Sequence, residues 1–473
     1  MSRHLTSQRY VFKIHSSRLR RAKWHLTLTI SQARENKELI ALNESQMMRF
    51  IDELNEVSDM SVHIADMKAQ IKKLQMIKDL AFSRPKIRKL YAELDDHLFQ
   101  KDYVCVVIDT TKDYMKLYKS GFQINGTTYR RLLATTGGVK NNTIVFVNET
   151  LLPELKRRMD NGRNKNMQFT PAKLEAYYAL TCSSSTPVSM PEGIAVVPDC
   201  ITHFQSDIIE LDDTGLKQPR MKYIKDKDIA LNDSDGYGLA MPPLMQRWGE
   251  DIGENFLLPG CVIRNAFCKG AVFPVDFRKF AREHHVETIT DVWGNTRNIQ
   301  DIELILTQSM LKLWDSYDSM EDYLENCRKN HYTFSITKSS AEELEHVRTM
   351  NYQFLQSYEF TDEQIEELIA PTVSEIQDIL SDDPVKTILY TKGIGLNEKN
   401  IGHLDSSFAT ALMIEPEMRN DPYVKSQLFA MIRKRIDDAK VGVLKVPANY
   451  SFVSGDPYSL CQSMCGLKVT GLL

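Results

Sequence analysis

Apolar and polar positions follow two distinct patterns along this chain. Between residues 31 and 100, apolar side chains recur mostly every three to five positions among charged residues, which predicts a packed helical hairpin interrupted at Pro85. Short runs rich in apolar residues predict strands instead, and they occupy residues 10–14, 24–30, 104–109 and 143–147.

Changes in this pattern divide the chain into segments. Short strands and turns dominate residues 188–312, whereas helical spacing and heavy acidic usage return after residue 312. We therefore expect an α+β fold with five segments: a basic N-terminus and helical arm (1–100), a mixed α/β domain (101–187), a compact β domain (188–312), a helical region (313–383) and a mixed C-terminal segment (384–473).

Composition narrows the class of protein. The 473 residues are 42% apolar, which is too much for a disordered chain. The longest apolar runs fall far short of the roughly 18–20 residues that span a bilayer, so we expect no transmembrane helix and no membrane partner. The first 34 residues hold eight Lys and Arg and no acid, but they lack the apolar segment of a secretory signal. A mitochondrial presequence stays open.

Cysteine usage and net charge add two further limits. Eight cysteines without a C-x-x-C pair favour reduced thiols in a cytoplasmic protein. Cys461 and Cys465 have no second pair, so no zinc site is expected. The net charge of −4 excludes a wholly basic, histone-like binder. It does not exclude a nucleic-acid enzyme, because a basic channel can lie on an otherwise acidic surface.

The first segment that could carry chemistry is a loop with two carboxylates and two glycines. Asp233 and Asp235 stand two residues apart, beside Gly236 and Gly238. Carboxylate oxygens suit Mg²⁺, but Asp is also a common side-chain acceptor in a turn. Taken alone, this pattern favours the turn.

Two lysine motifs follow the loop. Arg264 precedes Lys269 and Gly270, and a Lys-Gly step at a strand start places an ammonium where a phosphate can approach the backbone. Lys312 stands among apolar neighbours, so its stem is expected to be buried with its charge reaching a polar site. The alternative for Lys269 is an ordinary surface lysine before a turn. The alternative for Lys312 is a lysine that reaches from the core to solvent.

Order and spacing make these motifs specific as a set. Four short motifs occur in order: D-G-x-G at 235–238, I-R at 263–264, K-G at 269–270 and S-M-x-K at 309–312. This series resembles the first double-psi β-barrel of the two-barrel, single-chain RNA polymerases. This family includes the RNA-interference type of RNA-dependent polymerase and the phage and prophage YonO-like and crAss-like enzymes. Leu313 replaces the family's Phe. Further stretches resemble the phage branch: 118–129, 161–164, 173–178, 351–356 and 454–458.

The resemblance implies a fold and a set of roles. Residues 188–312 would form the first double-psi barrel. Lys269 and Lys312 match the family's lysines and Arg264 its nearby arginine, which implies that they hold the phosphates of the incoming nucleotide and the RNA 3′ end. Asp235, Gly236 and Gly238 match the structural glycine loop. Nucleoside triphosphates, a nucleic-acid template and an RNA product are the implied partners.

One motif of the family is missing from these 473 residues. The second barrel of such polymerases holds Mg²⁺ with a D-x-D-G-D loop, whereas the nearest pattern here, at residues 233–237, ends in Tyr237 and precedes the lysines. We therefore expect no metal site in this chain, and we interpret it as the N-terminal part of a phage or prophage polymerase acting in a bacterial cytoplasm. The second barrel would lie on a downstream polypeptide or be lost by truncation. A DNA template is expected, and an RNA template stays open.

A basic cluster offers a nucleic-acid contact. Five cations fall within ten residues, opposed by Asp160 alone, and this pattern fits either a nucleic-acid path or an ordinary solvated helix face. The five are Lys156, Arg157, Arg158, Arg163 and Lys165.

Two alternative functions stay open. The first is a non-catalytic remnant that binds nucleic acid, which predicts salt-dependent binding without nucleotide incorporation. The second is a stand-alone Mg²⁺-dependent phosphotransferase that uses Asp233 and Asp235.

Overall fold

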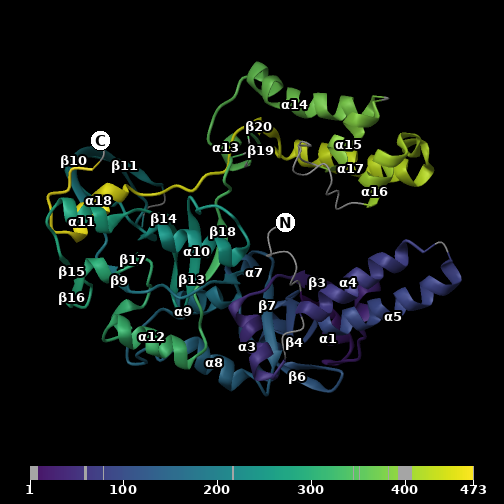
Figure 1. Cartoon of the computed structure of the whole chain (residues 1–473), viewed down its shortest axis with the longest axis horizontal. Helices are drawn as coiled ribbons and strands as arrows, with labels where there is room; N and C mark the ends of the chain where they lie inside the picture. Colours follow the sequence, from purple (N-terminus) through teal and green to yellow (C-terminus); the bar gives the residue numbers. More distant parts are fainter. Residues whose placement is uncertain are drawn as a thin grey trace. The chain divides into compact units, whose positions relative to one another are not determined.

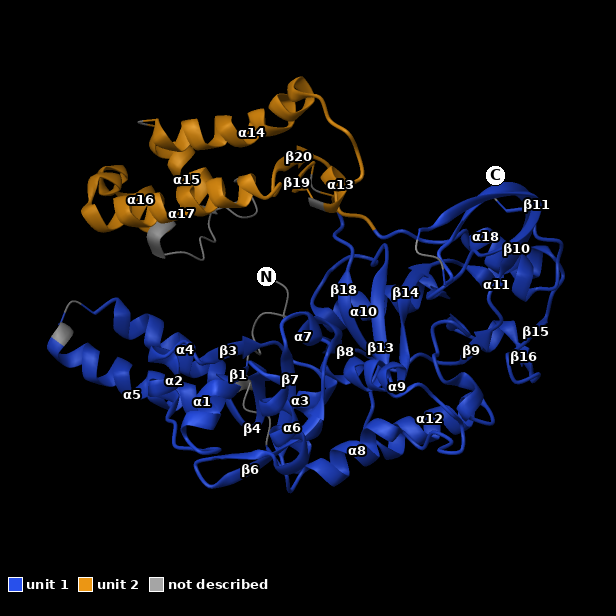
Figure 2. Ribbon diagram, turned by 180° about the vertical axis from the view of Figure 1, so that it is seen from behind, with its two compact units in different colours: residues 1–342, 452–473 blue, residues 343–451 orange. Residues whose placement is uncertain are grey.

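The computed structural model describes residues 9–471 except 58–60, 78, 216–217, 345, 351, 382 and 393–406 (Figure 1). Contacts between residues divide the chain into two compact units (Figure 2). Unit 1 comprises residues 1–342 together with 452–473, and unit 2 comprises residues 343–451. Helices and strands occur throughout, so the expected α+β class is confirmed.

The first sheet of unit 1 has seven strands in the order β2-β5-β6-β7-β4-β1-β3. Its central strand β4 sends alternate side chains to opposite faces, so Tyr103 and Cys105 enter one core while Val104 and Val106 enter another. The strands are β1 (Arg9–His15), β2 (His25–Leu26), β3 (Leu39–Leu42), β4 (Phe99–Val107), β5 (Phe122–Ile124), β6 (Thr127–Leu133) and β7 (Thr143–Asn148).

Helices cover both faces of this sheet. Side chains of α3 and α8 pack into the core that contains Tyr103, and those of α1 and α6 into the core that contains Val104. The helices here are α1 (Ser16–Arg21), α2 (Ile30–Glu35), α3 (Gln46–Leu54), α6 (Thr111–Ser120), α7 (Thr136–Lys140), α8 (Leu152–Asp160) and α9 (Pro171–Tyr178).

A helical hairpin of α4 (Ser61–Gln75) and α5 (Leu80–Leu98) extends from this sheet (Figure 1). Met67, Ile71, Leu94 and Leu98 form its small core. The hairpin was expected over residues 31–100, but its helices begin only at Ser61, because α2, β3 and α3 precede it. The expected interruption at Pro85 is wrong, since α5 runs through this residue.

The second sheet of unit 1 also has seven strands, in the order β8-β18-β13-β14-β12-β17-β9. Parallel pairs join β12 to β14 and β17 to β9, and the other pairs are antiparallel. The strands are β8 (Thr186–Pro187), β9 (Ile194–Val197), β12 (Tyr237–Ala240), β13 (Cys261–Asn265), β14 (Cys268–Pro274), β17 (Leu304–Thr307) and β18 (Ser335–Ser339).

Two helices and a ribbon accompany the second sheet. Trp248 of α10 (Pro242–Ile252) and Tyr323 of α12 (Met320–Lys329) are fully buried in its core. Between β9 and β12 the chain forms a two-stranded antiparallel ribbon of β10 (Ile201–Asp212) and β11 (Arg220–Asn232). Smaller elements complete this region: α11 (Phe277–Glu283), β15 (Thr288–Thr290) and β16 (Thr296–Asn298).

The described residues of unit 2 form helices and one short strand pair. The chain then returns to unit 1 through α18 (Pro457–Met464), whose Leu460 and Cys461 join a core with Tyr237. The five expected segments cut across these two units, and their boundaries stay a prediction. The elements of unit 2 are β19 (Val347–Thr349), α13 (Tyr352–Gln356), α14 (Asp362–Leu380), α15 (Pro384–Lys392), α16 (Ser407–Ile414), α17 (Pro422–Lys440) and β20 (Lys445–Pro447).

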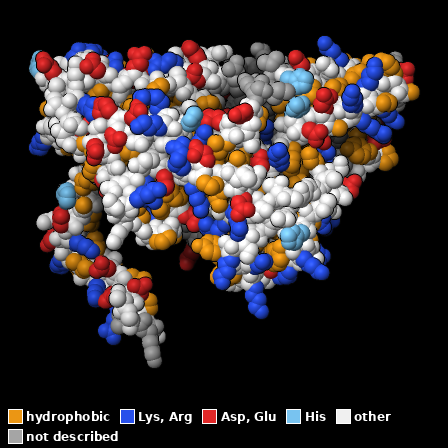
Figure 3. Space-filling model, turned by 90° about the horizontal axis from the view of Figure 1, so that it is seen from below, with side chains coloured by type: hydrophobic (Ala, Val, Ile, Leu, Met, Phe, Trp, Pro, Cys, Tyr) orange, Lys and Arg blue, Asp and Glu red, His pale blue; other side chains and the backbone are white. Residues whose placement is uncertain are grey.

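The surface carries charges of both signs. In the view of Figure 3, basic and acidic side chains are interspersed over most of the visible face, as expected for a net charge of −4. Within the part of the chain that the structure describes, no helix combines the length and the apolar character needed to cross a bilayer.

Candidate functional site

The hairpin of β13 and β14 carries the first two candidate cations. The strands pair antiparallel, with Arg264 directly opposite Lys269. Side chains alternate in burial along β13, so Ile263 and Asn265 are buried while Arg264 between them points to the other face. The register of this hairpin therefore sets Arg264 and Lys269 next to each other.

The loop after β17 brings Lys312 to the same hairpin. The backbone N–H of Lys269 donates to the carbonyl of Met310 at 3.1 Å, and the N–H of Lys312 donates to the carbonyl of Phe267 at 3.0 Å. Between these two hydrogen bonds, the loop forms an antiparallel bridge with the first residue of β14. The loop thus runs along the start of β14 as a short extra strand, which places Lys312 beside the two other cations.

Glycines allow the three motifs to meet. A Cβ on Gly270 would lie 2.5 Å from the carbonyl oxygen of Gly236 and 2.6 Å from Cε of Met310. A Cβ on Gly238 would lie 2.6 Å from the carbonyl oxygen of Ile305 and 2.9 Å from Sδ of Met310. All four separations are shorter than the contacts that real Cβ atoms make. The D-G-x-G loop, the K-G step and the S-M-x-K loop therefore pack into one body around Met310.

Ser309 fastens the lysine loop to the glycine loop. Its hydroxyl accepts a hydrogen bond from the N–H of Gly236 at 2.8 Å and donates one to Asp199 at 2.8 Å. Asp199 also accepts from the N–H of Ser309 at 3.2 Å and from the amide of Asn232 at 2.7 Å. Asp199 thus joins the end of the ribbon to the loop that carries Lys312.

Asp199 is a residue that motif reasoning missed. It lies in the short segment between β9 and β10, and no recognisable motif surrounds it. The one available signal is its place directly after the apolar run of β9, because polar residues at strand ends are where functional loops begin.

The three cations form a positive cluster, and the pKa of two of them, Lys269 and Arg264, is lowered. Burial lowers the pKa of Lys269, and the charges of Lys312 and Arg264 lower it further, while Asp235 acts in the opposite direction. Burial also lowers the pKa of Arg264, whose buried Nε has no hydrogen-bond partner. Among the described residues, none of the three forms an ion pair with a carboxylate. Such a cluster is suited to binding an anion.

The two carboxylates of the glycine loop do not build a metal site. The carboxylate of Asp233 accepts a hydrogen bond from the hydroxyl of Thr202, and Asp235 is exposed beside Lys269. Over the described ranges, no group of three or more His, Cys, Asp or Glu side chains could hold a metal ion. The residues present therefore do not fit Mg²⁺, which takes a closely packed set of oxygen ligands.

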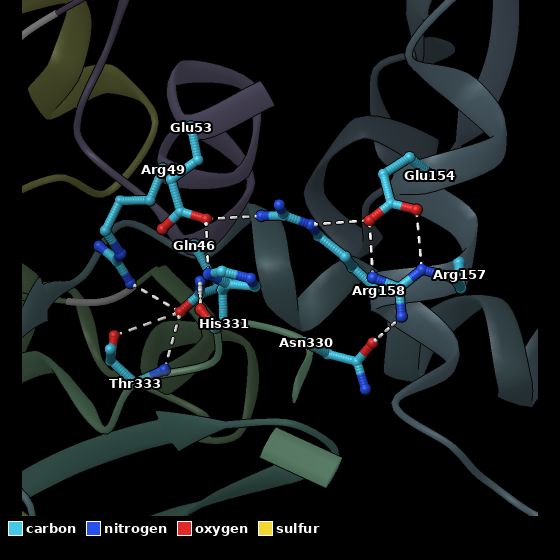
Figure 4. Close-up of polar contacts among 9 residues, drawn as sticks. All are labelled: Gln46, Arg49, Glu53, Glu154, Arg157, Arg158, Asn330, His331 and Thr333. Carbon is cyan, nitrogen blue, oxygen red and sulfur yellow. Dashed lines mark hydrogen bonds and ion pairs between the residues drawn. The ribbon is translucent and has the colours of Figure 1, made fainter. Parts of the chain in front are cut away.

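Arg157 and Arg158 of the basic cluster are engaged with carboxylates of the protein (Figure 4). Arg158 is only 7% exposed and donates to Glu53 at 2.6 Å and to Glu154 at 3.3 Å. Arg157 makes two bonds to Glu154, at 2.7 and 2.6 Å, and one to Asn330 at 2.7 Å. These contacts join α8 to α3 and to the end of α12.

The other three members of the cluster differ in their surroundings. Arg163 and Lys165 lie 3.3 and 3.2 Å from the carboxylate of Asp160, and Arg163 also donates to the hydroxyl of Tyr178 at 3.0 Å. Lys156 is exposed. A nucleic-acid contact through this cluster stays a prediction, but four of its five cations already have an acidic partner within the protein.

Comparisons with known proteins agree with the motifs. The family model described as RNA dependent RNA polymerase matches residues 62–452. The DNA-directed RNA polymerase YonO of Bacillus phage SPbeta is 29% identical over 353 residues, which are 73% of this chain and 39% of that protein. The solved structure of RNA dependent RNA polymerase QDE-1 from Thielavia terrestris matches with a TM-score of 0.40 and 12% identity, over 72% of this chain and 37% of that one.

These findings confirm the resemblance to the phage and RNA-interference types of polymerase. The chain spans less than half the length of either relative. Because the family model covers well over half of its residues, the chain belongs to the RNA-dependent RNA polymerase family.

Proposed function

We propose that this chain supplies the phosphate-binding side of the nucleotidyl-transfer site of an RNA polymerase, through Arg264, Lys269 and Lys312. One observation carries the proposal. Three motifs that lie up to 77 residues apart in sequence meet around Met310, and they bring together three cations that lack a carboxylate partner among the described residues.

The chemistry of nucleotidyl transfer explains why such a cluster is useful. The 3′ oxygen of the RNA attacks the α-phosphorus of a nucleoside triphosphate, and the bond to pyrophosphate breaks. Negative charge grows on the phosphate oxygens in the transition state, and preorganised cations stabilise this charge most when water is excluded. Lys269 and Lys312 each supply a compact ammonium charge for this purpose, and Arg264 supplies a planar array of N–H donors.

The proposal extends to the parts of the polymerase that these residues do not supply. Family polymerases use Mg²⁺, and the carboxylates that hold it would come from a D-x-D-G-D segment outside these 473 residues. We assign the five strands of the second sheet that fall within residues 188–312 to the first double-psi barrel: β9, β12, β13, β14 and β17. The name of the phage relative supports a DNA template.

The test is nucleotide incorporation by this chain complemented with a D-x-D-G-D segment of a related polymerase. Lys269→Ala and Lys312→Ala should each lower incorporation by about 100-fold or more, as the loss of a preorganised charge donor does. The matched control is Lys279→Ala, because Lys279 is an exposed lysine of the same unit that pairs with Glu283. Near-normal rates in both site variants would contradict the proposal.

A measurement on the chain alone completes the test. ATP binding without Mg²⁺ should weaken about 10-fold or more in each site variant and stay unchanged in Lys279→Ala. Unaltered ATP binding in all three variants would show that the cluster does not hold phosphates.

A further inference from the structure

The hairpin α4–α5 is strongly polarised in charge along its length. Its distal half, residues 68–89 on either side of the turn between the helices, contains eight Lys and Arg and a single acid, Asp79. The remainder of α5, residues 90–98, contains three acids and neither Lys nor Arg. We call residues 68–89 the distal arm. Figure 1 shows it at the end of the hairpin away from the sheet of unit 1.

The cations of the distal arm are available to a partner. The structure describes seven of them, all exposed, and none forms an ion pair within the described chain. Lys86 lies over the ring of Phe82, with Nζ 3.7 Å from the ring centre. The seven described cations are Lys68, Lys72, Lys73, Arg84, Lys86, Arg88 and Lys89.

Their arrangement on the helices is unfavourable for the isolated protein. Lys68 and Lys72 are four residues apart on α4, and Arg84 and Arg88 are four residues apart on α5. Residues at this spacing are neighbours on one helix face, and like charges there repel each other. An array of phosphates would remove this repulsion. The cluster at residues 156–165 differs, since four of its five cations already pair with Glu154 or Asp160.

The apolar residues of the hairpin argue against a membrane-surface helix. A helix of that kind needs a free apolar face to insert. Here the apolar faces of α4 and α5 are turned towards each other, where Met67, Ile71, Leu94 and Leu98 are buried. The distal arm also exposes Met76 and Ile77 just after α4 and Phe82 in α5, so these side chains do not form one continuous apolar helix face, and seven exposed cations accompany them.

We propose that the distal arm binds duplex nucleic acid through its phosphate backbone. The inference rests on the proposed function only for the choice of a nucleic acid as the polyanion. Duplex DNA carries one negative charge per roughly 1.7 Å of its axis, and residues 80–89 of α5 span about 15 Å. Two helices that carry cations at regular spacing match such a dense and regular charge array. Single strands are instead held in grooves that stack their bases.

The experiment measures the affinity of the full 473-residue chain for a fluorescent 30-base-pair DNA duplex by anisotropy, over a series of salt concentrations. The test variant replaces four cations of the distal arm by Gln, which keeps a good helix former at each position. The four are the pairs four residues apart on each helix: Lys68 and Lys72, and Arg84 and Arg88. The control variant removes four exposed cations that already have acidic partners, so its net charge changes equally. The control positions are Lys222, Lys279, Arg328 and Lys329.

We expect the test variant to bind the duplex at least 10-fold more weakly at moderate salt. The slope of log affinity against log salt should become shallower by about three to four, since each lost phosphate contact contributes about 0.9. The control should stay within about 3-fold of the wild type. Equal binding by the two variants, or no duplex binding by the wild type, would overturn the proposal.

Two further experiments separate this inference from its rivals. In one, vesicles of phosphatidylserine and phosphatidylcholine replace the duplex. If the distal arm binds these vesicles and does not bind DNA, the choice of partner is overturned. In the other experiment, the test variant is assayed for ATP binding without Mg²⁺. This variant leaves Arg264, Lys269 and Lys312 intact, so it should bind ATP like the wild type whether or not it binds the duplex, and the two ideas fail independently.

Discussion

At the scale of single residues, the candidate site depends on two glycines, because a larger side chain would not fit at either position. Gly270 and Gly238 leave room for Met310, and Met310 in turn places the loop that carries Lys312. The electrostatics also belong to this scale, because the pKa of Lys269 is lowered by burial and by the other two cations of the cluster.

Gly270→Ala should lower the free energy of unfolding by about 1–3 kcal/mol, the usual cost of overpacking a filled site. The added methyl group would press on the backbone of Gly236 and on Met310. Urea unfolding measures the effect. Gly137→Ala is the matched control, because Gly137 lies in α7 with no atom near its missing Cβ, and this variant should be neutral or slightly more stable. Equal stability of the two variants would contradict the packing argument.

The lowered pKa of Lys269 predicts a pH effect with a defined sign. Phosphate binding needs the charged ammonium, so ATP affinity should fall as pH rises through the lowered pKa, at a pH where an ordinary lysine is still charged. In the free protein the unfolded chain holds this proton more tightly, so the same group makes stability rise with pH over that window. Titration calorimetry at several pH values checks the binding. Lys269→Arg should keep its affinity throughout, and a parallel decline in both proteins would refute the assignment.

At the scale of elements, apolar runs were a good guide and local backbone signals were missed. The runs at 10–14 and 143–147 became β1 and β7, but the run at 24–30 forms only the two residues of β2. Its end belongs to a helix instead, because the side chains of Thr29 and Gln32 form a capping box that begins α2. That T-x-x-Q signal was present in the sequence and outweighed the apolar run.

The loop that carries Lys312 yields the prediction for elements. Ser309→Ala removes the acceptor of the Gly236 N–H and the donor to Asp199. It should lower the free energy of unfolding by about 1–3 kcal/mol, because two partly buried partners each lose a hydrogen bond and one of these partners is a carboxylate. It should also weaken ATP binding. Ser426→Ala removes a hydroxyl that bonds only within exposed α17, so its effect should stay within about 0.5 kcal/mol. A Ser309 variant as stable as this control would show that the anchor is dispensable.

At the scale of the whole molecule, the chain leaves unit 1 after Glu342 and re-enters it at Phe452. Composition placed α12 with the later helices, yet its Tyr323 is buried in the core of the second sheet and the helix belongs to unit 1. Sequence periodicity shows that a helix has an apolar face but not which partner covers it, so the pattern did not show that α12 packs on the second sheet. The motifs of the site were readable because their order and spacing are specific.

The two compact units predict two thermal unfolding transitions. Calorimetry of the full chain should resolve them, since each unit has its own core. A variant in which a flexible linker replaces residues 343–451 should keep the transition of unit 1 and lose the other. A single cooperative transition in the full chain, or an unfolded linker variant, would contradict this division.

The return of the chain to unit 1 has a consequence for biosynthesis. The thiol of Cys200 donates to the carbonyl of Ser459, 259 residues further along, and Gly455 packs directly against the carbonyl of Asp233. A ribosome adds about 5–20 residues per second, so the glycine loop waits on the order of 10–50 s for the segment that covers it. During that interval the loop lacks its final neighbour, so the packing around the candidate site can be completed only after residues 455–459 have been synthesised.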